Sequence, residues 1–245
     1  MVSIRKYSVV HKLVSGAFFC YTYMHMGKLQ PTKPLFIMLY GVPGSGKTFI
    51  ARQLCEHIAA AHIQGDRIRA ELFEKPTYNK EENHIVASLM TYMAGEFLRS
   101  GMSVIFDTNV MRLSQRRALR NIALKSNAEP ILLWLQIDAD SAYTRARKRD
   151  RRKHDDRFAQ EMTPEVFQRL LGGMQNPDTT EPFVVLSGKH VFSTQKNAII
   201  RYLLERQLIS LDTVTQPLSK PGLVNLVPNP AAGRVDMSRR NISIR

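Results

Sequence analysis

Hydrophobic positions along the chain form short continuous runs separated by longer segments in which they recur at helical spacing. Four runs have strand length and are rich in β-branched and aromatic residues, and a fifth is shorter and more polar. They are LFIMLY (35–40), SVIFD (103–107), ILLWLQI (131–137), FVVL (183–186) and AHIQ (61–64). Runs that are apolar at nearly every position predict strands buried on both faces, as in a parallel sheet.

The segments between these runs have the spacing and end signals of helices. Thr163-Pro164-Glu165 combines a capping hydroxyl, a proline for the first turn and an acid near the positive end of a helix. Ser193 is a candidate start for the last helix, and Gly101 a stop for an earlier one. Two apolar stripes are Ile50, Leu54 and Ile58, and Ile85, Leu89, Met93 and Phe97. Strands that alternate with helices predict an α/β fold.

The pattern also divides the chain into three parts. We expect an N-terminal extension (1–33), one α/β domain (34–208) and a proline-rich C-terminal tail (209–245) in which helical stripes are absent. The stretch from Val9 to Gly27 loosely mimics a signal peptide, but His11 and Lys12 interrupt it and no convincing cleavage site follows. No run is long and apolar enough to cross a bilayer, so we expect no membrane partner.

Composition adds a charge that needs an explanation. The 245 residues carry a formal net charge of +14, which favours polyanionic partners such as nucleotides or nucleic acid, or reflects a generally basic, soluble surface. The two cysteines, Cys20 and Cys55, are too few for a disulfide framework and have no metal-ligand spacing. We therefore expect a reduced, cytoplasmic protein.

The stretch GVPGSGKT fits the phosphate-binding pattern G-x-x-x-x-G-K-[ST] at every fixed position. Glycines allow successive backbone N–H groups to point at phosphate oxygens, and the start of the following helix adds partial positive charge. Lys47 is expected to reach the β- and γ-phosphates, and Thr48 to offer its hydroxyl to Mg²⁺. The nucleotide-binding residues are therefore predicted to be Gly41, Val42, Pro43, Gly44, Ser45, Gly46, Lys47 and Thr48, with ATP and Mg²⁺ as cofactors.

Two acidic positions downstream suit a phosphoryl transfer site. In HIQGDRIRAELFE, Asp66 and Arg69 share one face if a helix starts here, so the carboxylate can deprotonate a hydroxyl beside the guanidinium. In SVIFDTN, Asp107 ends a buried strand at the edge where open α/β sheets bind ligands, and it can support the metal or orient Arg69. The ordinary alternatives are a helix cap at Asp66 and a turn at Asp107.

A basic segment, DADSAYTRARKRDRRKHDDR, follows the fourth predicted strand. Arg147 and Arg151 lie one helical turn apart, which suits a lid that closes over the phosphates. Arg145 and Arg149 have the same spacing and leave the choice of pair open. A solvated basic helix or a nucleic-acid patch explains the segment equally well.

With these motifs in hand, the chain resembles small P-loop kinases, the AAA domain-containing kinases of the polynucleotide 5′-hydroxyl kinase and zeta-toxin kind. The resemblance runs from about 34 to 208 and rests on GVPGSGKT, D-x-x-R, DTN and R-x-x-x-R. It implies a P-loop NTPase fold of three αβα layers, with a five-stranded parallel sheet in the order 2-3-1-4-5 and a helical lid. It also implies the site roles: Lys47 and Thr48 on phosphate and metal, Asp66 as base, Arg69 on the substrate side, Asp107 at the metal, and Arg147 and Arg151 in the lid.

The acceptor is less defined by the sequence. A run of basic residues follows DTN and favours an RNA or DNA 5′-end over a neutral small molecule. Its members are Arg112, Arg116, Arg117, Arg120 and Lys125. Trp134 falls in a buried-looking strand and is expected in the core, and the 188–191 loop is the expected place for the base of the nucleotide. Three hypotheses follow: a kinase for a nucleic-acid 5′-hydroxyl, a kinase for a small molecule such as a nucleotide sugar, antibiotic or nucleoside, and a non-catalytic ATP-binding regulatory module.

Overall fold

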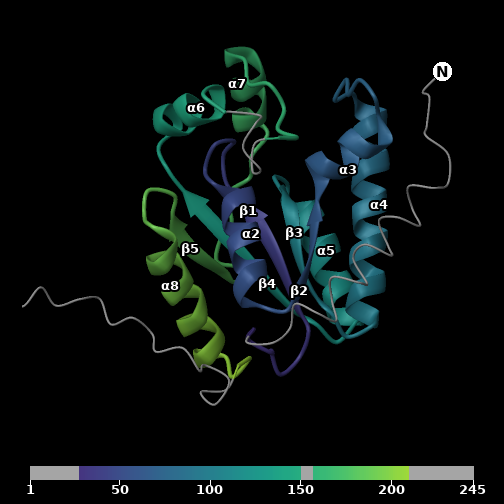
Figure 1. The fold of residues 1–245 in the computed structure, drawn as a ribbon, viewed down its shortest axis with the longest axis vertical. Helices are drawn as coiled ribbons and strands as arrows, with labels where there is room; N and C mark the ends of the chain where they lie inside the picture. Colours follow the sequence, from purple (N-terminus) through teal and green to yellow (C-terminus); the bar gives the residue numbers. More distant parts are fainter. Residues whose placement is uncertain (1–27, 150–156, 210–245) are drawn as a thin grey trace, which may run out of the picture. The chain divides into compact units, whose positions relative to one another are not determined.

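A computed structural model describes residues 28–149 and 157–209, which contain five strands and seven helices between them (Figure 1). In chain order these are β1 (Leu35–Tyr40), α2 (Lys47–His57), β2 (Ala60–Gln64), α3 (Gly65–Leu72), α4 (Lys80–Arg99), β3 (Ser103–Asn109), α5 (Leu113–Lys125), β4 (Glu129–Gln136), α6 (Ala139–Arg147), α7 (Pro164–Gly172), β5 (Phe183–Ser187) and α8 (Phe192–Glu205). The last helix begins one residue before the predicted Ser193. Cys20 and Arg151 lie outside the described residues.

The five strands form one parallel sheet in the order β2-β3-β1-β4-β5, which confirms the predicted fold class and strand order. The central strand β1 pairs with β3 on one side and with β4 on the other, so Ile37 lies between Ile105 and Ile131. Because the strands are parallel, their carboxyl ends meet at one edge of the sheet. The phosphate-binding loop follows β1 and the start of α3 follows β2 at this edge, where Asp107 lies in the last residues of β3.

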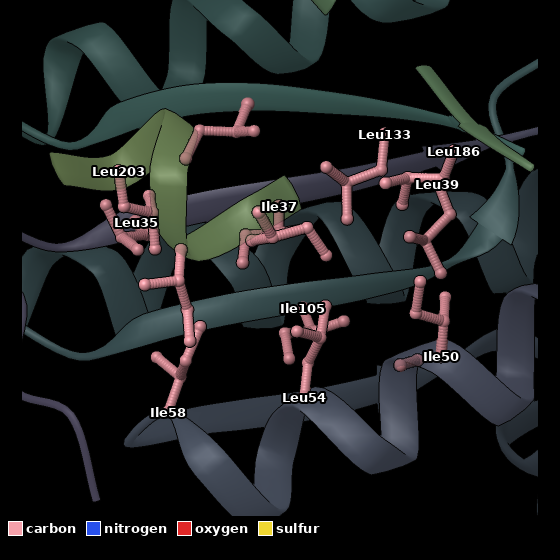
Figure 2. Packing of buried hydrophobic residues seen from close by; sticks show 14 of the residues in the cluster. Leu35, Ile37, Leu39, Ile50, Leu54, Ile58, Ile105, Leu133, Leu186 and Leu203 are labelled. Carbon is pink, nitrogen blue, oxygen red and sulfur yellow. The ribbon is translucent and has the colours of Figure 1, made fainter. Parts of the chain in front are cut away.

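Helices cover both faces of the sheet and define two cores. Alternate residues of β1 point to opposite sides, so Ile37 and Leu39 pack toward α2 and α8 while Phe36 and Met38 pack toward α4 and α5. Figure 2 shows the first core, where the predicted stripe of α2 points its Ile50, Leu54 and Ile58 side chains at the strands. Each such side chain contributes about 1.5–3 kcal/mol when it is fully buried.

The stripe predicted for α4 is shifted by one residue. The buried positions of α4 include Val86, Met90, Ala94 and Leu98, whereas Leu89, Met93 and Phe97 are only partly buried and Ile85 is 36% exposed. The helix is therefore turned by about 100° from the predicted orientation, the angle between successive residues. Large apolar side chains lie on both stripes, so their spacing alone does not show which stripe faces the sheet.

The helices α6 and α7 do not cover the sheet. They lie together beyond the carboxyl end of β4 and form a small core of their own around Ala142, Ala146, Met162 and Phe167 (Figure 1). The Thr163 hydroxyl accepts a hydrogen bond from the Val166 N–H, so α7 starts where the sequence predicts. This pair of helices has the position of a lid over the phosphate-binding loop.

The described residues that precede β1 also pack on the domain. Leu29 lies in the core beside α2 and pairs with Ile58 in an isolated parallel bridge, and the Thr32 N–H donates to the Leu208 carbonyl. The domain boundaries after residues 33 and 208 stay predictions. No helix within the described ranges is both long enough and apolar enough to span a bilayer.

Candidate functional site

The loop from Gly41 to Gly46 connects β1 to α2 with a backbone that two of its glycines make possible. Gly44 has a φ of 86°, and a Cβ placed on it would lie 2.1 Å from the Ala142 carbonyl oxygen of α6. Gly46 has a φ of 97° and caps α2 without a side-chain hydrogen bond. These left-handed conformations are unfavourable for other residues. The N-terminus of α2 consequently opens directly onto the loop, with its N–H groups available to an anion.

The Lys47 side chain folds back over this loop. Its Nζ donates hydrogen bonds to the carbonyl oxygens of Gly41 at 2.8 Å and Val42 at 3.0 Å. Burial, followed by the neighbouring positive charge of Arg149, lowers the pKa of Lys47 to about 8, while Asp107 and Asp66 act in the opposite direction. The ammonium group therefore lies over the loop, and the charges of both predicted carboxylates act on it.

Asp107 is buried at the carboxyl end of β3, next to the first turn of α2. It shares the α2 side of the strand with Ile105, because the two residues are two positions apart. Its Oδ1 accepts a hydrogen bond from the Thr48 hydroxyl at 3.3 Å, and its Oδ2 lies 3.0 Å from Nε2 of His62 on β2. Two residues later, the side-chain oxygen of Asn109 accepts from the Gly41 N–H at 3.4 Å. The end of β3 thus holds both the start of the loop and the start of α2.

Asp66 occupies the first turn of α3, the helix that the sequence predicts there. Burial raises the pKa of the Asp66 carboxyl, and the nearby Asp107 carboxylate raises it further against the opposing charges of Arg149, Arg69 and Lys47. The carboxyl group is therefore close enough to Lys47 and Asp107 for their charges to act on it. Asp66 and the phosphate-binding loop therefore lie at the same edge of the sheet.

Arg69 is buried one helical turn after Asp66 and is held from the side of α4. Its guanidinium donates to Glu82 at 3.1 Å and to Asn83 at 2.6 Å, and it lies over the Tyr78 ring at 4.6 Å from the centroid. Burial acts to raise the pKa of Glu82, but hydrogen bonds from Thr77, Tyr78 and Arg69 outweigh it and lower that pKa. This network fixes α3, and with it Asp66, against the start of α4.

Of the two lid arginines Arg149 and Arg147, Arg149 acts more directly on the residues around the phosphate-binding loop. The positive charge of Arg149 acts on both Lys47 and Asp66, whereas Arg147 is exposed at the end of α6. Arg145, one turn before Arg149, donates to the Gly188 carbonyl at 2.8 Å. Gly188 begins the loop expected near the nucleotide base, and a Cβ on it would lie 3.0 Å from the Ser45 carbonyl. The alternative pair, Arg145 and Arg149, therefore brackets the phosphate-binding loop.

Arg116 does not take part in the basic surface predicted after DTN. It is 1% exposed and bonds Glu181 through Nε and Nη2, with its remaining donors on the carbonyls of Val110, Met111 and Gln175. A fully paired, buried guanidinium cannot contact a polyanion. The exposed cations that remain on α5 include Arg117 and Lys125, while Arg120 is half-buried and lines, with Arg117, a cavity of about 310 Å³.

Trp134 is only partly in the core. It makes edge-to-face contacts with Tyr40 and Phe183 at centroid distances of 5.8 and 5.4 Å, and it also lines a cavity of about 670 Å³. The lid helix α7 and Val42 of the phosphate-binding loop line the same cavity. Trp134 lies on β4, beside the edge strand β5, and faces this cavity, so its side chain is less buried than its run of apolar neighbours predicts.

The chemistry of these residues suits a nucleoside triphosphate with a divalent cation. Backbone N–H groups and Lys47 suit phosphate oxygens, while the Thr48 hydroxyl and the Asp107 carboxylate are hard oxygen donors of the kind Mg²⁺ prefers. The strand order and the phosphate-binding loop together are those of the P-loop kinase fold. The AAA domain family AAA_33 matches residues 36–177, more than half of the chain, and the protein belongs to this family.

Solved structures share the fold at low identity. A sugar kinase from Janibacter sp. HTCC2649 has a TM-score of 0.51 and 19% identity, covering 71% of this chain and 95% of its own. Kti12 from Chaetomium thermophilum, in complex with ADP-AlF3, has a TM-score of 0.55 and 15% identity, covering 71% and 100%. The APS kinase CysC from Mycobacterium tuberculosis, in complex with AMPPNP and APS, has a TM-score of 0.50 and 17% identity, covering 71% and 99%. Sequence comparison with curated proteins finds no significant match.

Some residues of the site carry no motif. His62, Glu82 and Asn83 reach the predicted residues through the pairing of β2 with β3 and the packing of α3 on α4. His62 and Asp107, for example, are 45 residues apart in the sequence, so no local pattern joins them. For Glu82 a local signal exists, because Asn79 caps α4 by accepting from the Glu82 N–H, and this predicts the helix start that carries it.

Proposed function

We propose that this protein is an ATP- and Mg²⁺-dependent kinase that transfers the γ-phosphoryl group to a hydroxyl of a small molecule. The observation that carries the proposal is the position of Asp66 in the first turn of α3, at the same edge of the sheet as the phosphate-binding loop, where its charge acts on the pKa of Lys47. A base beside the phosphate-binding loop is what separates a kinase from a simple nucleotide receptor. The kinase folds of the neighbours and the ligands named for Kti12 and CysC support the nucleotide part of the proposal.

Each residue has a role in this reaction. Asp66 takes the proton of the acceptor hydroxyl, and its raised pKa brings that carboxylate closer to the pH at which it works as a base. Lys47 of the loop and Arg149 of the lid neutralise charge on the transferred group. Arg69 contributes its charge and holds α3, since its Nη donors are engaged by Glu82 and Asn83. Thr48 and Asp107 would hold Mg²⁺, which supplies further charge stabilisation at the phosphates.

A nucleic-acid 5′-hydroxyl is the second candidate acceptor. The net charge of +14 and the exposed Arg112 and Arg117 near the start of α5 favour it. The burial of Arg116 removes one of the five cations on which this candidate rested. The names of two neighbours, a sugar kinase and an APS kinase, favour the small molecule, so we rank the small molecule first.

The test is transfer of label from γ-labelled ATP to a pool of cellular metabolites and, separately, to hydroxyl-ended oligonucleotides. Label on a metabolite supports the proposal, and label on the oligonucleotide supports the second candidate. Asp66→Asn should reduce transfer by about 100-fold or more while ATP affinity stays within about threefold. Glu71→Gln, an exposed acid on the same helix, is the matched control and should be fully active. A wild-type protein that binds ATP and labels neither pool would refute the kinase, and an active Asp66→Asn variant would refute the assignment of the base.

A further inference from the structure

One side chain next to the site belongs to neither the phosphate-binding loop nor any recognised motif. His62 lies in the middle of β2, an edge strand, and its Nε2 is 3.0 Å from Asp107 Oδ2. Because an ionised carboxylate only accepts hydrogen bonds, the imidazole nitrogen facing it carries the proton. The two oxygens of Asp107 therefore have separate partners on two different elements, His62 of β2 and Thr48 of α2.

The sheet register explains how His62 reaches Asp107. His62 pairs with Ile105 and Gln64 pairs with Asp107, so His62 is one pleat below the carboxylate on the same face of the two strands. Ile63, the next residue, points to the opposite face and is buried in the core beside α4. A one-residue slip of β2 would bury His62 and expose Ile63, so the contact is fixed by the same pattern that fixes the strand.

We infer that His62 is a positioning residue that orients the Asp107 carboxylate for the cation of the bound nucleotide. With Oδ2 held by the imidazole, Oδ1 stays directed at the Thr48 hydroxyl, so the two oxygen donors face the same point. Partners that orient a metal-supporting carboxylate typically change metal affinity by about 10–100-fold when they are removed. This inference rests on the metal role of Thr48 and Asp107 in the proposed function.

The test measures binding and does not require transfer. AMPPNP is titrated into the wild type and into His62→Leu by isothermal calorimetry, with Mg²⁺ and with EDTA. We expect His62→Leu to weaken AMPPNP binding about tenfold with Mg²⁺ and to leave it unchanged in EDTA. His62→Gln keeps an N–H donor at similar reach and should restore most of the Mg²⁺-dependent affinity. His84→Gln, on the exposed side of α4, is the control for removing an imidazole elsewhere and should match the wild type.

The possible outcomes separate this inference from the proposed function. If the wild type binds AMPPNP more tightly with Mg²⁺ and His62→Leu keeps that difference, the positioning role is wrong while the metal site stands. If His62→Leu loses affinity equally with Mg²⁺ and with EDTA, the residue serves only the structure of β2 and the inference fails. If the wild type shows no Mg²⁺ dependence, the metal roles of Thr48 and Asp107 fail and the inference fails with them.

Discussion

The buried guanidinium of Arg116 allows a sharp test of the structure, because its neighbour in sequence is a natural control. Arg116 and Arg117 have the same chemistry and the same helix, but Arg116 is 1% exposed and Arg117 faces solvent. Arg116→Met keeps most of the side-chain volume and removes the charge. It leaves the Glu181 carboxylate, itself only 12% exposed, without its partner.

The expected loss of stability follows from these contacts. Removing one partner of a buried ion pair costs about 3–5 kcal/mol, because the remaining charge is left without compensation. The carbonyls of Val110, Met111 and Gln175 lose a donor as well, which places the loss toward the upper part of that range. For a domain of this size, each kcal/mol lowers the Tm by about 2–4 °C, so we expect a decrease of about 6–20 °C. Arg117→Met should change the free energy of unfolding by about 0.5 kcal/mol or less.

The assay is thermal and urea unfolding of the two single variants, of Glu181→Met and of the Arg116→Met/Glu181→Met double variant. Removing both partners leaves no isolated charge, so the double variant should be at least about 1 kcal/mol more stable than the sum of the singles predicts. An Arg116→Met protein whose Tm stays within about 2 °C of the wild type would refute the buried pair. Equal losses for Arg116→Met and Arg117→Met would refute the orientation of α5.

Three further predictions concern single groups. Because the pKa of Lys47 is about 8 and only the charged ammonium attracts phosphate, ATP affinity should fall about tenfold between pH 7 and pH 9. Lys47→Arg should flatten that profile in calorimetric titrations, and a flat wild-type profile would contradict the shift. Arg149→Ala should lower kcat by about tenfold or more in the labelling assay while Arg147→Ala stays within about twofold, and the reverse order would return the lid role to Arg147. Burial raises the pKa of Cys55 to about 12, so in a Cys20→Ser background iodoacetamide at pH 8 should label the protein only after unfolding, as mass spectrometry would show.

The order of the elements could be predicted from the sequence because each strand is a separate apolar run. Even β2, the weakest, follows the pattern, since it is an edge strand with its polar residues, His62 and Gln64, on the α2 side. The orientation of α4 was wrong by one position. Large apolar residues lie on both faces of this helix, Leu89 and Met93 on one and Val86 and Met90 on the other, so counting them did not identify the buried face.

The residues of the site also divide into those that the sequence could place and those that it could not. Residues within one short motif, such as Lys47 with Thr48 or Asp66 with Arg69, could be placed because a loop or a helical turn fixes their spacing. Partners that come from another helix or strand could not be placed from the sequence. The prediction that Arg116 faces a polyanion failed for this reason, because Glu181 lies 65 residues away and nothing local in either segment indicates the pairing.

The separate core of α6 and α7 has a consequence for how the protein opens. The core of the lid has four buried apolar residues, whereas the two cores on the sheet contain many more. Val42 and Ile137, which lie outside α6 and α7, pack against the lid core. Cooperative units with few buried contacts open at a lower free energy than the whole molecule. In native-state hydrogen exchange, amides of α6 and α7 should therefore lose protection well before those of β1, so the lid is expected to open locally while the sheet stays folded.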